Sequence, residues 1–297
     1  MTARPGGPDR DGVHTVLSVL RGAEAWLAKA GADAPQRSAE LLLGKVLGCT
    51  RLQLYLAHDR PLDERERAAM RELVARRGKG EPVAYLLGGW SFRGLDLEVG
   101  PAVLVPRPET EGLVEHALAC LQGPGGTAID LGTGSGAIAI ALATARPDLR
   151  VLATDVSQNA LALAAANVQR HGLGGRVTLA HGSWWQAVPG DARFELVVSN
   201  PPYIDPRASA ELAADVRAFE PPLALFTAPG DVASCYRELA AGLPAHLAPG
   251  GWFVAETGVG ASEPARAVFA ALPFLEGVEL RPDDAGIPRY LLARARP

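Results

Sequence analysis

The chain has 297 residues, of which 48% are hydrophobic and 21% are charged, and its net charge is −4. The length predicts about two domains of ordinary size, and the composition is that of a globular protein. Because no run of about 18 apolar residues occurs, a membrane-spanning helix is excluded. The acidic balance argues against a nonspecific nucleic-acid binder.

The start of the chain and the cysteines indicate a cytoplasmic protein. Residues 1–12 are polar, rich in glycine and proline, and lack the apolar core of a signal peptide, so we expect them to be disordered and the protein not to be secreted. Cys49, Cys120 and Cys235 are too few and too scattered for a disulfide framework or a cysteine-based zinc site. We therefore predict free thiols and no bound metal ion.

The next segment predicts a small all-α domain. Apolar residues recur at spacings of three and four over residues 16–27 and 39–47, which is typical of helices with one buried face. A short helix is expected over residues 52–57. Asp63, with Glu66 three residues later, predicts a capping box that opens a further helix.

Charge and strand patterns place a border after this domain. Residues 1–84 carry 14 Lys and Arg against 11 Asp and Glu, a net charge of +3, whereas the remainder carries 15 against 22, a net charge of −7. Residues 85–107 contain alternating apolar residues bounded by glycines, which predicts a β-hairpin that connects two domains. The second domain is then expected over residues 108–297.

Strand and helix patterns alternate through this second domain. Five short runs rich in β-branched residues are separated by longer helical stretches, and the C-terminus predicts two more strands within residues 278–295. The expected strands cover residues 127–132, 150–156, 176–182, 194–200 and 251–257. This alternation predicts an α/β fold with a mostly parallel sheet covered by helices on both faces. Such sheets bind ligands at the carboxyl ends of their strands, where the strand order reverses.

A glycine-rich turn follows the first of these strands. It consists of Gly132, Thr133, Gly134, Ser135 and Gly136. Glycines are needed where a ligand approaches backbone N–H groups closely or where φ is positive. The G-x-G-x-G spacing differs from the G-x-G-x-x-G of nicotinamide proteins and fits an adenosyl ligand without a pyrophosphate. A tight strand-to-helix turn without a ligand is the alternative.

Two further motifs lie at expected strand ends. Asp155 comes 19 residues after Gly136, where a carboxylate typically accepts hydrogen bonds from ribose hydroxyls, although it can also simply cap the next helix. The run from Asn200 to Tyr203 reads Asn-Pro-Pro-Tyr. Two prolines stiffen the turn, the asparagine oxygen and a proline carbonyl can accept from an NH₂ group, and the tyrosine offers a face for stacking. The run can also serve as a plain loop breaker.

In this order and spacing, the motifs resemble the class I methyltransferases that use S-adenosylmethionine. Together with the N-terminal helices, the VPRPET run and the VRAFEPPLAL run, nearly the whole chain resembles the bacterial protein-(glutamine-N5) methyltransferases of peptide chain release factors. The resemblance implies a Rossmann-like, mostly parallel seven-stranded sheet after a helical substrate-recognition domain. It also implies methyl transfer from S-adenosylmethionine to the glutamine of a Gly-Gly-Gln motif, with S-adenosylhomocysteine as the product. We expect a monomer that acts on release factors, without a membrane or nucleic-acid partner.

The resemblance also implies roles for particular residues. Gly132 to Gly136 contact the methionine part of the cofactor, and Asp155 holds its ribose. Trp184 lies where the family has an aromatic residue near the adenine, although Trp185 is an equally placed neighbour, and Ser183 stands where the family often has an aspartate. The residues expected to hold the substrate glutamine are Asn200, Pro201, Pro202 and Tyr203; Asn200 and Pro201 are the catalytic pair, and Asn200 also borders the cofactor. The segment from Arg107 to Thr110 is expected to line the cofactor entrance, with Glu220 and Pro221 as scaffold.

Three alternatives stay open at this point. A glutamine of a ribosomal protein or the N6 amino group of adenine in DNA would also suit Asn-Pro-Pro-Tyr, since each is a planar NH₂ group. The Pro-Glu-Thr after Arg107 favours release factors, and the acidic second domain without a basic DNA-reading insert argues against DNA. A cofactor-binding module without catalysis is the third alternative, and the two intact motifs argue against it.

Overall fold

The computed structural model describes residues 14–297, which divide into two compact units. The first unit contains residues 14–88 together with Ala213–Phe219, and the second contains Gly89–Leu212 together with Glu220–Pro297. The sequence places a border at residue 84 and does not assign residues 213–219 to the helical part. The prediction that residues 1–12 are disordered lies outside the described residues.

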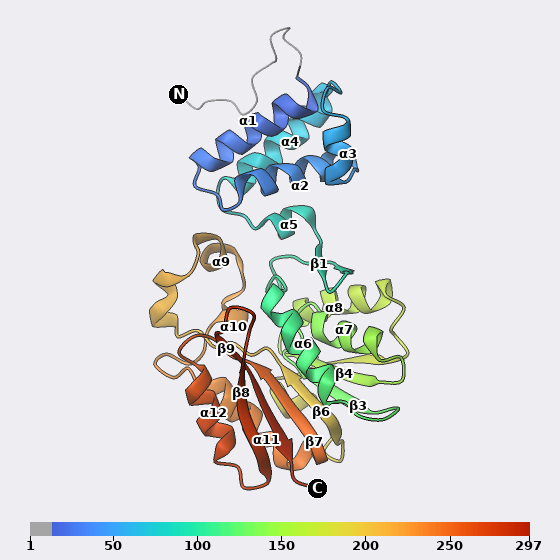
Figure 1. Cartoon of the computed structure of the whole chain (residues 1–297), viewed down its shortest axis with the longest axis vertical. Helices are drawn as coiled ribbons and strands as arrows, with labels where there is room; N and C mark the ends of the chain where they lie inside the picture. Colours follow the sequence, from blue (N-terminus) through green and yellow to red (C-terminus); the bar gives the residue numbers. More distant parts are fainter. Residues whose placement is uncertain (1–13) are drawn as a thin grey trace. The chain divides into compact units, whose positions relative to one another are not determined.

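The first unit is built from helices, as the apolar spacing predicts (Figure 1). They are α1 (Val16–Lys29), α2 (Pro35–Leu47), α3 (Arg51–Leu56), α4 (Glu64–Arg77), α5 (Val83–Leu87) and the later α9 (Ala214–Phe219). The predicted capping box is confirmed: Glu66 N donates to Asp63 Oδ1 at 2.8 Å, and Asp63 N donates to Glu66 Oε2 at 3.0 Å. Leu42, Leu43 and Leu27 are fully buried at the centre of this bundle.

The second unit begins with the predicted hairpin. Strands β1 (Trp90–Phe92) and β2 (Leu95–Leu97) pair antiparallel. The two residues between them, Arg93 and Gly94, have φ angles of 50° and 75°. Two successive positive φ angles give a turn whose twist matches that of the paired strands.

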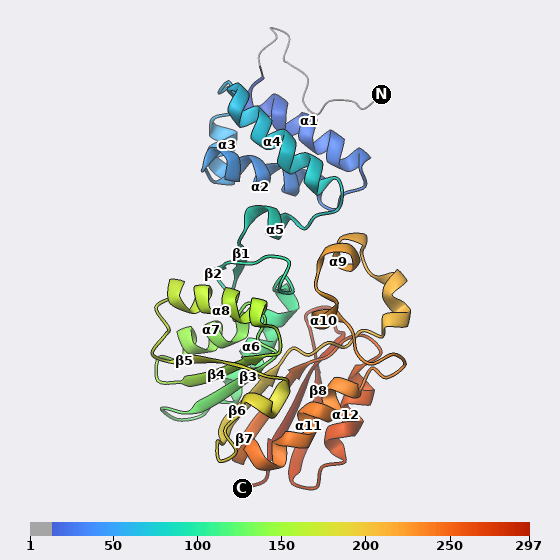
Figure 2. The same ribbon diagram turned by 180° about the vertical axis from the view of Figure 1, so that it is seen from behind.

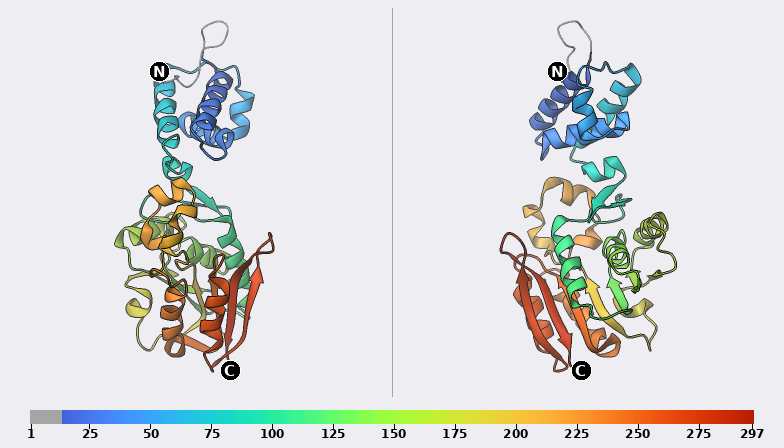
Figure 3. Two further views of the ribbon diagram at one scale, coloured as in Figure 1. Left: turned by 90° about the vertical axis from the view of Figure 1, so that its left-hand side faces the viewer. Right: turned by 45° about the vertical axis from the view of Figure 1, so that its right-hand side comes forward.

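One seven-stranded sheet forms the centre of this unit among the described residues. Its strands stand in the order β5-β4-β3-β6-β7-β9-β8, and β9 runs opposite to the other six. Figure 3 shows β8 at one edge. The strands are β3 (Thr127–Leu131), β4 (Arg150–Asp155), β5 (Val177–His181), β6 (Phe194–Ser199), β7 (Leu247–Glu256), β8 (Leu275–Pro282) and β9 (Pro288–Ala295). The predicted mostly parallel seven-stranded α/β sheet is confirmed.

Helices cover both faces of the sheet. One face packs against α6 (Pro108–Cys120), α7 (Ala137–Ala145) and α8 (Gln158–Arg170). The other packs against α11 (Ser234–His246) and α12 (Ser262–Ala270), which lie side by side in Figure 2. Short helices η1 (Trp184–Ala187), η2 (Pro206–Glu211) and α10 (Pro222–Leu225) lie in the connections. Within residues 14–297, no helix is both long and apolar enough to cross a bilayer.

The strand residues alternate between the two faces. In β3, Ala128 packs into one core, whereas Ile129 and Leu131 pack into the other, as the two-residue period of a strand requires. The strand order reverses between β3 and β6, because the chain leaves β3 toward one edge and returns through β6 toward the other. A ligand site is therefore expected at the carboxyl ends of β3 and β6.

Candidate active site

A cavity of about 360 Å³ opens at this reversal point, within the second unit. It lies at the carboxyl ends of β3, β4 and β6, and each of these ends carries one of the motifs found in the sequence. The predicted site residues that line it are Gly132, Thr133, Gly134, Ser135, Asp155, Trp184, Asn200 and Pro202, and Thr110 and Pro221 from the expected entrance and scaffold line it too. Motifs that are far apart along the chain thus meet around one space large enough for a nucleoside-sized ligand.

The glycine-rich turn forms one wall. Gly132, Gly134 and Gly136 have φ angles of 78°, 56° and 83°, a region that side chains with a Cβ rarely adopt. At Gly134, which lines the cavity, there is open space where a Cβ would stand. Gly136 is not among the lining residues: it caps α7, and a Cβ there would lie 3.1 Å from Ile140 Cδ1. A glycine is favoured at this position by the positive φ and by the close approach of the Ile140 side chain.

Asp155 is held at the end of β4 by two backbone groups. Gly134 N donates to its Oδ2 and Ser157 N donates to its Oδ1, each at 2.8 Å. These two bonds fix the carboxylate against the glycine-rich turn and leave lone pairs on both oxygens. A carboxylate of this kind at the cavity edge can accept further hydrogen bonds from hydroxyl groups.

Asp130, just before the glycine-rich turn, is a site residue to which the sequence motifs assign no role. It is fully buried in β3, where its Oδ2 accepts from Thr133 Oγ1 at 2.6 Å and from Ala139 N at 3.3 Å. Its Oδ1 has no hydrogen-bond partner among residues 14–297. Burial raises the pKa of Asp130 to about 7, and the nearby charge of Asp155 adds to this. The carboxyl braces the inner side of the glycine-rich turn.

The two neighbouring tryptophans point to different surroundings. Trp184 lines the cavity and has a φ of 48°, an uncommon conformation for a bulky residue. Trp185 turns toward α11, where its Nε1 donates to Leu239 O at 3.0 Å and its ring stacks on His246 with 5.0 Å between centroids. Of this pair, the structure puts Trp184 at the cavity.

Asn200 follows β6 and faces the cavity beside the first turn of α6. Its Nδ2 donates to Thr110 Oγ1 at 3.1 Å, and Thr110 Oγ1 in turn donates to Glu256 Oε2 at 2.7 Å. The end of β6 is tied to β3 by Ser199 Oγ, which donates to Leu131 O at 2.7 Å. The side chain of Asn200 is thus held by a chain of buried polar groups. Glu256 at the end of β7 is a residue that the sequence reasoning missed.

Pro201 and Tyr203, the neighbours of Asn200 in the Asn-Pro-Pro-Tyr run, are not among the lining residues of the cavity. Pro201 is buried. The Tyr203 hydroxyl donates to Glu256 Oε1 at 3.3 Å, and burial followed by the Glu256 charge raises the pKa of this phenol. The ring packs directly on Gly258, where a Cβ would lie only 2.3 Å from its Cδ2. Any larger residue at position 258 would displace the Tyr203 ring.

An ion pair joins the segment expected at the cofactor entrance to the residue expected as scaffold. Arg107 Nη2 lies 2.5 Å from Glu220 Oε1, and the Glu220 side chain is buried. Further parts of the wall are apolar and include Val103, Leu104, Leu223 and Phe226, none of which was given a role from the sequence. These four residues come from the loop after β2 and from α10 with its C-cap, which are far apart in the chain, so no local spacing marks them. Within residues 14–297, no group of three His, Cys, Asp or Glu could hold a metal ion.

The sheet order with its antiparallel β9, and the glycine-rich turn at the carboxyl end of β3, define a class I methyltransferase. The fold is shared with a methyltransferase from Pyrococcus furiosus, which has a TM-score of 0.51 and 20% identity over 75% of this chain and 96% of that one. Family models described as "PrmC N-terminal domain" and "Methyltransferase small domain" match residues 18–88 and 110–218.

Curated relatives identify the family. A release factor glutamine methyltransferase from Geobacter sulfurreducens is 41% identical over 95% of this chain and 97% of its own length. The one from Bordetella pertussis is 47% identical over 86% of this chain and 93% of its own. The chain belongs to the release factor glutamine methyltransferase family, as the sequence motifs indicate.

Proposed function

We propose that this enzyme transfers a methyl group from S-adenosylmethionine to N5 of the glutamine in the Gly-Gly-Gln motif of peptide chain release factors, leaving S-adenosylhomocysteine. The observation that carries the proposal is the placement of Asn200 at the rim of the cavity that the glycine-rich turn also lines. An amide acceptor and an adenosyl-sized space are what such a transfer requires. The family of the chain supports the same acceptor.

The residues around the cavity fit the cofactor. Gly132 to Ser135 offer a wall free of side-chain bulk at Gly134, and Asp155 keeps lone pairs for the ribose hydroxyls. Trp184 offers a ring for the adenine. When bound, S-adenosylmethionine supplies a strongly electrophilic methyl group on a sulfonium whose leaving group is neutral, so the proposed reaction needs no metal ion.

The substrate glutamine is proposed to lie at Asn200, Pro201, Pro202 and Tyr203. The amide nitrogen is a poor nucleophile, because its lone pair is delocalised into the carbonyl. In this proposal, Asn200 Oδ1 and the Pro201 carbonyl accept its two hydrogens, which would fix the plane of the amide and stabilise the positive charge that develops on nitrogen. Positioning of this kind requires no strong general base before the transfer, and the methylated nitrogen then releases its extra proton to water.

Recognition of the rest of the release factor is assigned to residues 1–84. They contain no catalytic motif and carry a net charge of +3, and one glutamine alone offers little surface for binding a large protein. In this proposal, residues 85–107 link the recognition domain to the methyltransferase domain at residues 108–297. The enzyme works as a cytoplasmic monomer, without a membrane or nucleic-acid partner.

Mass spectrometry of a release factor treated with the enzyme and S-adenosylmethionine tests the proposal. We expect a gain of one methyl group on the Gly-Gly-Gln glutamine, and no gain on a release factor in which that glutamine is replaced by glutamate. Ribosomal proteins and adenine-containing DNA are treated in parallel with labelled cofactor. Label in either of these, with none in the release factor, would overturn the proposal.

A further inference from the structure

A series of buried hydrogen bonds lies behind Asn200. It connects the end of β6, the first turn of α6 and the end of β7. Thr110 stands in the first turn of α6 and is 4% exposed, and Glu256 stands at the end of β7 and is 1% exposed. Thr110 Oγ1 lies 2.7 Å from Glu256 Oε2 and 3.1 Å from Asn200 Nδ2. Placing a carboxyl group at such depth is costly, so a structural purpose is expected for it.

The chemistry of these groups sets the direction of each hydrogen bond. An ionised carboxylate can only accept, and a threonine hydroxyl has one hydrogen to give. Burial raises the pKa of Glu256, whereas the hydrogen bonds from Thr110 and Tyr203 and the charge of Arg289 favour its ionised form. Thr110 gives that hydrogen to Glu256, so its oxygen can only accept at the second contact. The group of Asn200 that faces Thr110 must therefore be the NH₂. No hydrogen bond from residues 14–297 reaches Asn200 Oδ1, which stays available as an acceptor at the cavity.

This direction matters because the two ends of an asparagine amide have nearly the same shape. A flipped Asn200 would present its NH₂ to the NH₂ of the substrate, and two donors cannot form a hydrogen bond. Packing alone does not distinguish the two orientations, whereas the acceptor offered by Thr110 does. We propose that Thr110 and Glu256 are positioning residues that hold the Asn200 amide with its oxygen toward the substrate amide. This inference rests on the proposed transfer to a glutamine side chain.

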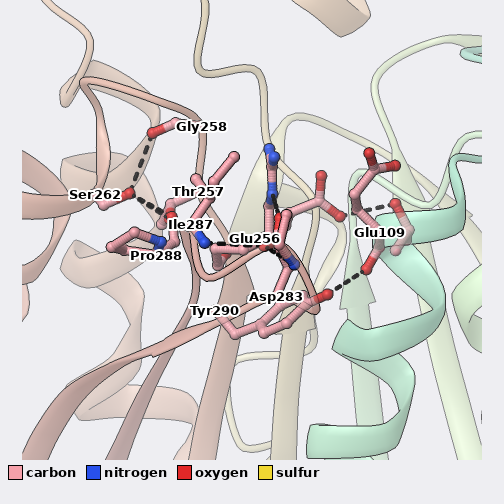
Figure 4. A network of polar contacts seen from close by, with 12 residues as sticks. Glu109, Glu256, Thr257, Gly258, Ser262, Asp283, Ile287, Pro288 and Tyr290 are labelled. Atoms are coloured by element: carbon pink, nitrogen blue, oxygen red, sulfur yellow. Dashed lines mark hydrogen bonds and ion pairs between the residues drawn. The ribbon is translucent and has the colours of Figure 1, made fainter.

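Glu256 is itself held from several sides. The Tyr203 hydroxyl donates to its other carboxylate oxygen, Oε1, at 3.3 Å, and the Tyr236 hydroxyl donates to its backbone oxygen at 2.9 Å. The first turn of α6 is anchored to β9 by the Tyr290 hydroxyl, which donates to Glu109 O at 2.8 Å (Figure 4). One carboxylate therefore orients both polar side chains of the Asn-Pro-Pro-Tyr run.

A matched pair of variants at position 110 tests the proposal. Thr110→Val keeps the branched shape but removes the hydroxyl, whereas Thr110→Ser keeps the hydroxyl and removes a methyl group. We expect the valine variant to lower kcat for release factor methylation about tenfold, the loss that one neutral hydrogen bond supports, with unchanged affinity for S-adenosylmethionine. The serine variant should stay within about twofold of the wild type, a difference too small to represent a lost hydrogen bond. A valine variant with wild-type kcat would overturn the proposal.

Glu256→Leu is the second variant, since it leaves the Thr110 hydroxyl without its acceptor, so that Thr110 can donate to Asn200 and favour the flipped amide. We expect it to lower kcat in the same way, while circular dichroism shows a folded protein. A wild-type kcat for this variant would also contradict the proposal.

A readout that needs no methyl acceptor separates this inference from the proposed function. The side-chain NH₂ resonances of Asn200, assigned by their absence in Asn200→Ala, should exchange slowly in the wild type and in Thr110→Ser but rapidly in Thr110→Val. If release factors were not methylated, this pattern would still test the orientation. If they were methylated and the pattern were absent, the inference alone would fail.

Discussion

Arg77 of α4 and Asp215 of α9 form an ion pair in which Nη1 and Oδ2 lie 3.6 Å apart. The Arg77 side chain is 3% exposed, pairs also with Asp33, and donates to Glu81 O at 3.1 Å. The partner helix belongs to a segment, Ala213–Phe219, that leaves the sheet domain after the Asn-Pro-Pro-Tyr run and packs with the helical unit. One buried cation thus fastens a late segment of the chain onto the N-terminal bundle.

Arg77→Met should loosen this segment. The substitution keeps much of the buried volume but removes every donor, so we expect the helical unit to lose about 1–3 kcal/mol, the cost of breaking a buried charged hydrogen-bond network. Amide hydrogen exchange should show lost protection over Ala213–Phe219. Arg76→Met is the matched control, because Arg76 pairs at the surface with Glu81. Equal exchange in the two variants would contradict the role given to Arg77.

Asn200→Ala should abolish most of the methyl transfer and weaken cofactor binding far less, although Asn200 also lines the cavity. The substitution removes the proposed acceptor for the substrate amide, and loss of a group that stabilises developing charge costs about 10²–10³ in kcat. Calorimetry with S-adenosylmethionine serves as the control, since the glycine-rich turn and Asp155 are unchanged. Transfer near the wild-type rate would exclude the mechanism proposed for this residue.

Trp184→Ala and Trp185→Ala should have opposite consequences. Trp184 lines the cavity, so its loss should weaken S-adenosylmethionine binding about tenfold, the worth of one good aromatic contact, with little change in Tm. Trp185 packs on α11, and a Cβ at Gly242 would lie only 2.4 Å from its ring. Its loss should destabilise the fold by about 2–3 kcal/mol through a cavity. Calorimetry and thermal melts distinguish the two, and weaker binding in Trp185→Ala alone would reverse the assignment.

These tryptophans also show where prediction from the sequence stops. Local patterns predicted the capping box at Asp63, because its two partners are three residues apart. They could not separate Trp184 from Trp185, because neighbours on a tight turn face different sides and the sequence does not say which. The sheet order was predictable only through the family resemblance, since alternating strands and helices are compatible with several orders.

Contacts between distant segments were beyond local reasoning. Thr110 and Glu256 are 146 residues apart, and neither spacing nor periodicity links them. The run that contains Glu256 was recognised as a strand, but a glutamate at a strand end is most often solvated. Residues 213–219 were assigned to the second domain by position in the chain, whereas they pack with the first. Such relations are consequences of the tertiary fold alone.

The carboxyl group of Asp130 should make the stability of the cofactor-free enzyme depend on pH. Burial raises its pKa from 3.8 to about 7 in the folded protein. Between about pH 4 and pH 7, the folded state therefore holds a proton that the unfolded state has released, so stability falls as pH rises through this window and levels off above it. Carboxyls with lowered pKa values, such as Asp148 beside Arg146, change stability with the opposite sign and at lower pH.

Asp130→Asn isolates this contribution. The new amide oxygen can accept from Thr133 and Ala139 as Oδ2 does, and the side chain no longer titrates. Urea unfolding gives the free energy of unfolding of each protein at each pH. As pH rises across the window, the value for the variant should increase relative to that of the wild type by on the order of 3 kcal/mol. Asp148→Asn is the matched surface control and should show no such trend between about pH 4 and pH 7, because the pKa of Asp148 is lowered. Parallel stability curves for Asp130→Asn and the wild type would mean that Asp130 is ionised throughout, and that the inner wall of the glycine-rich turn carries a full negative charge.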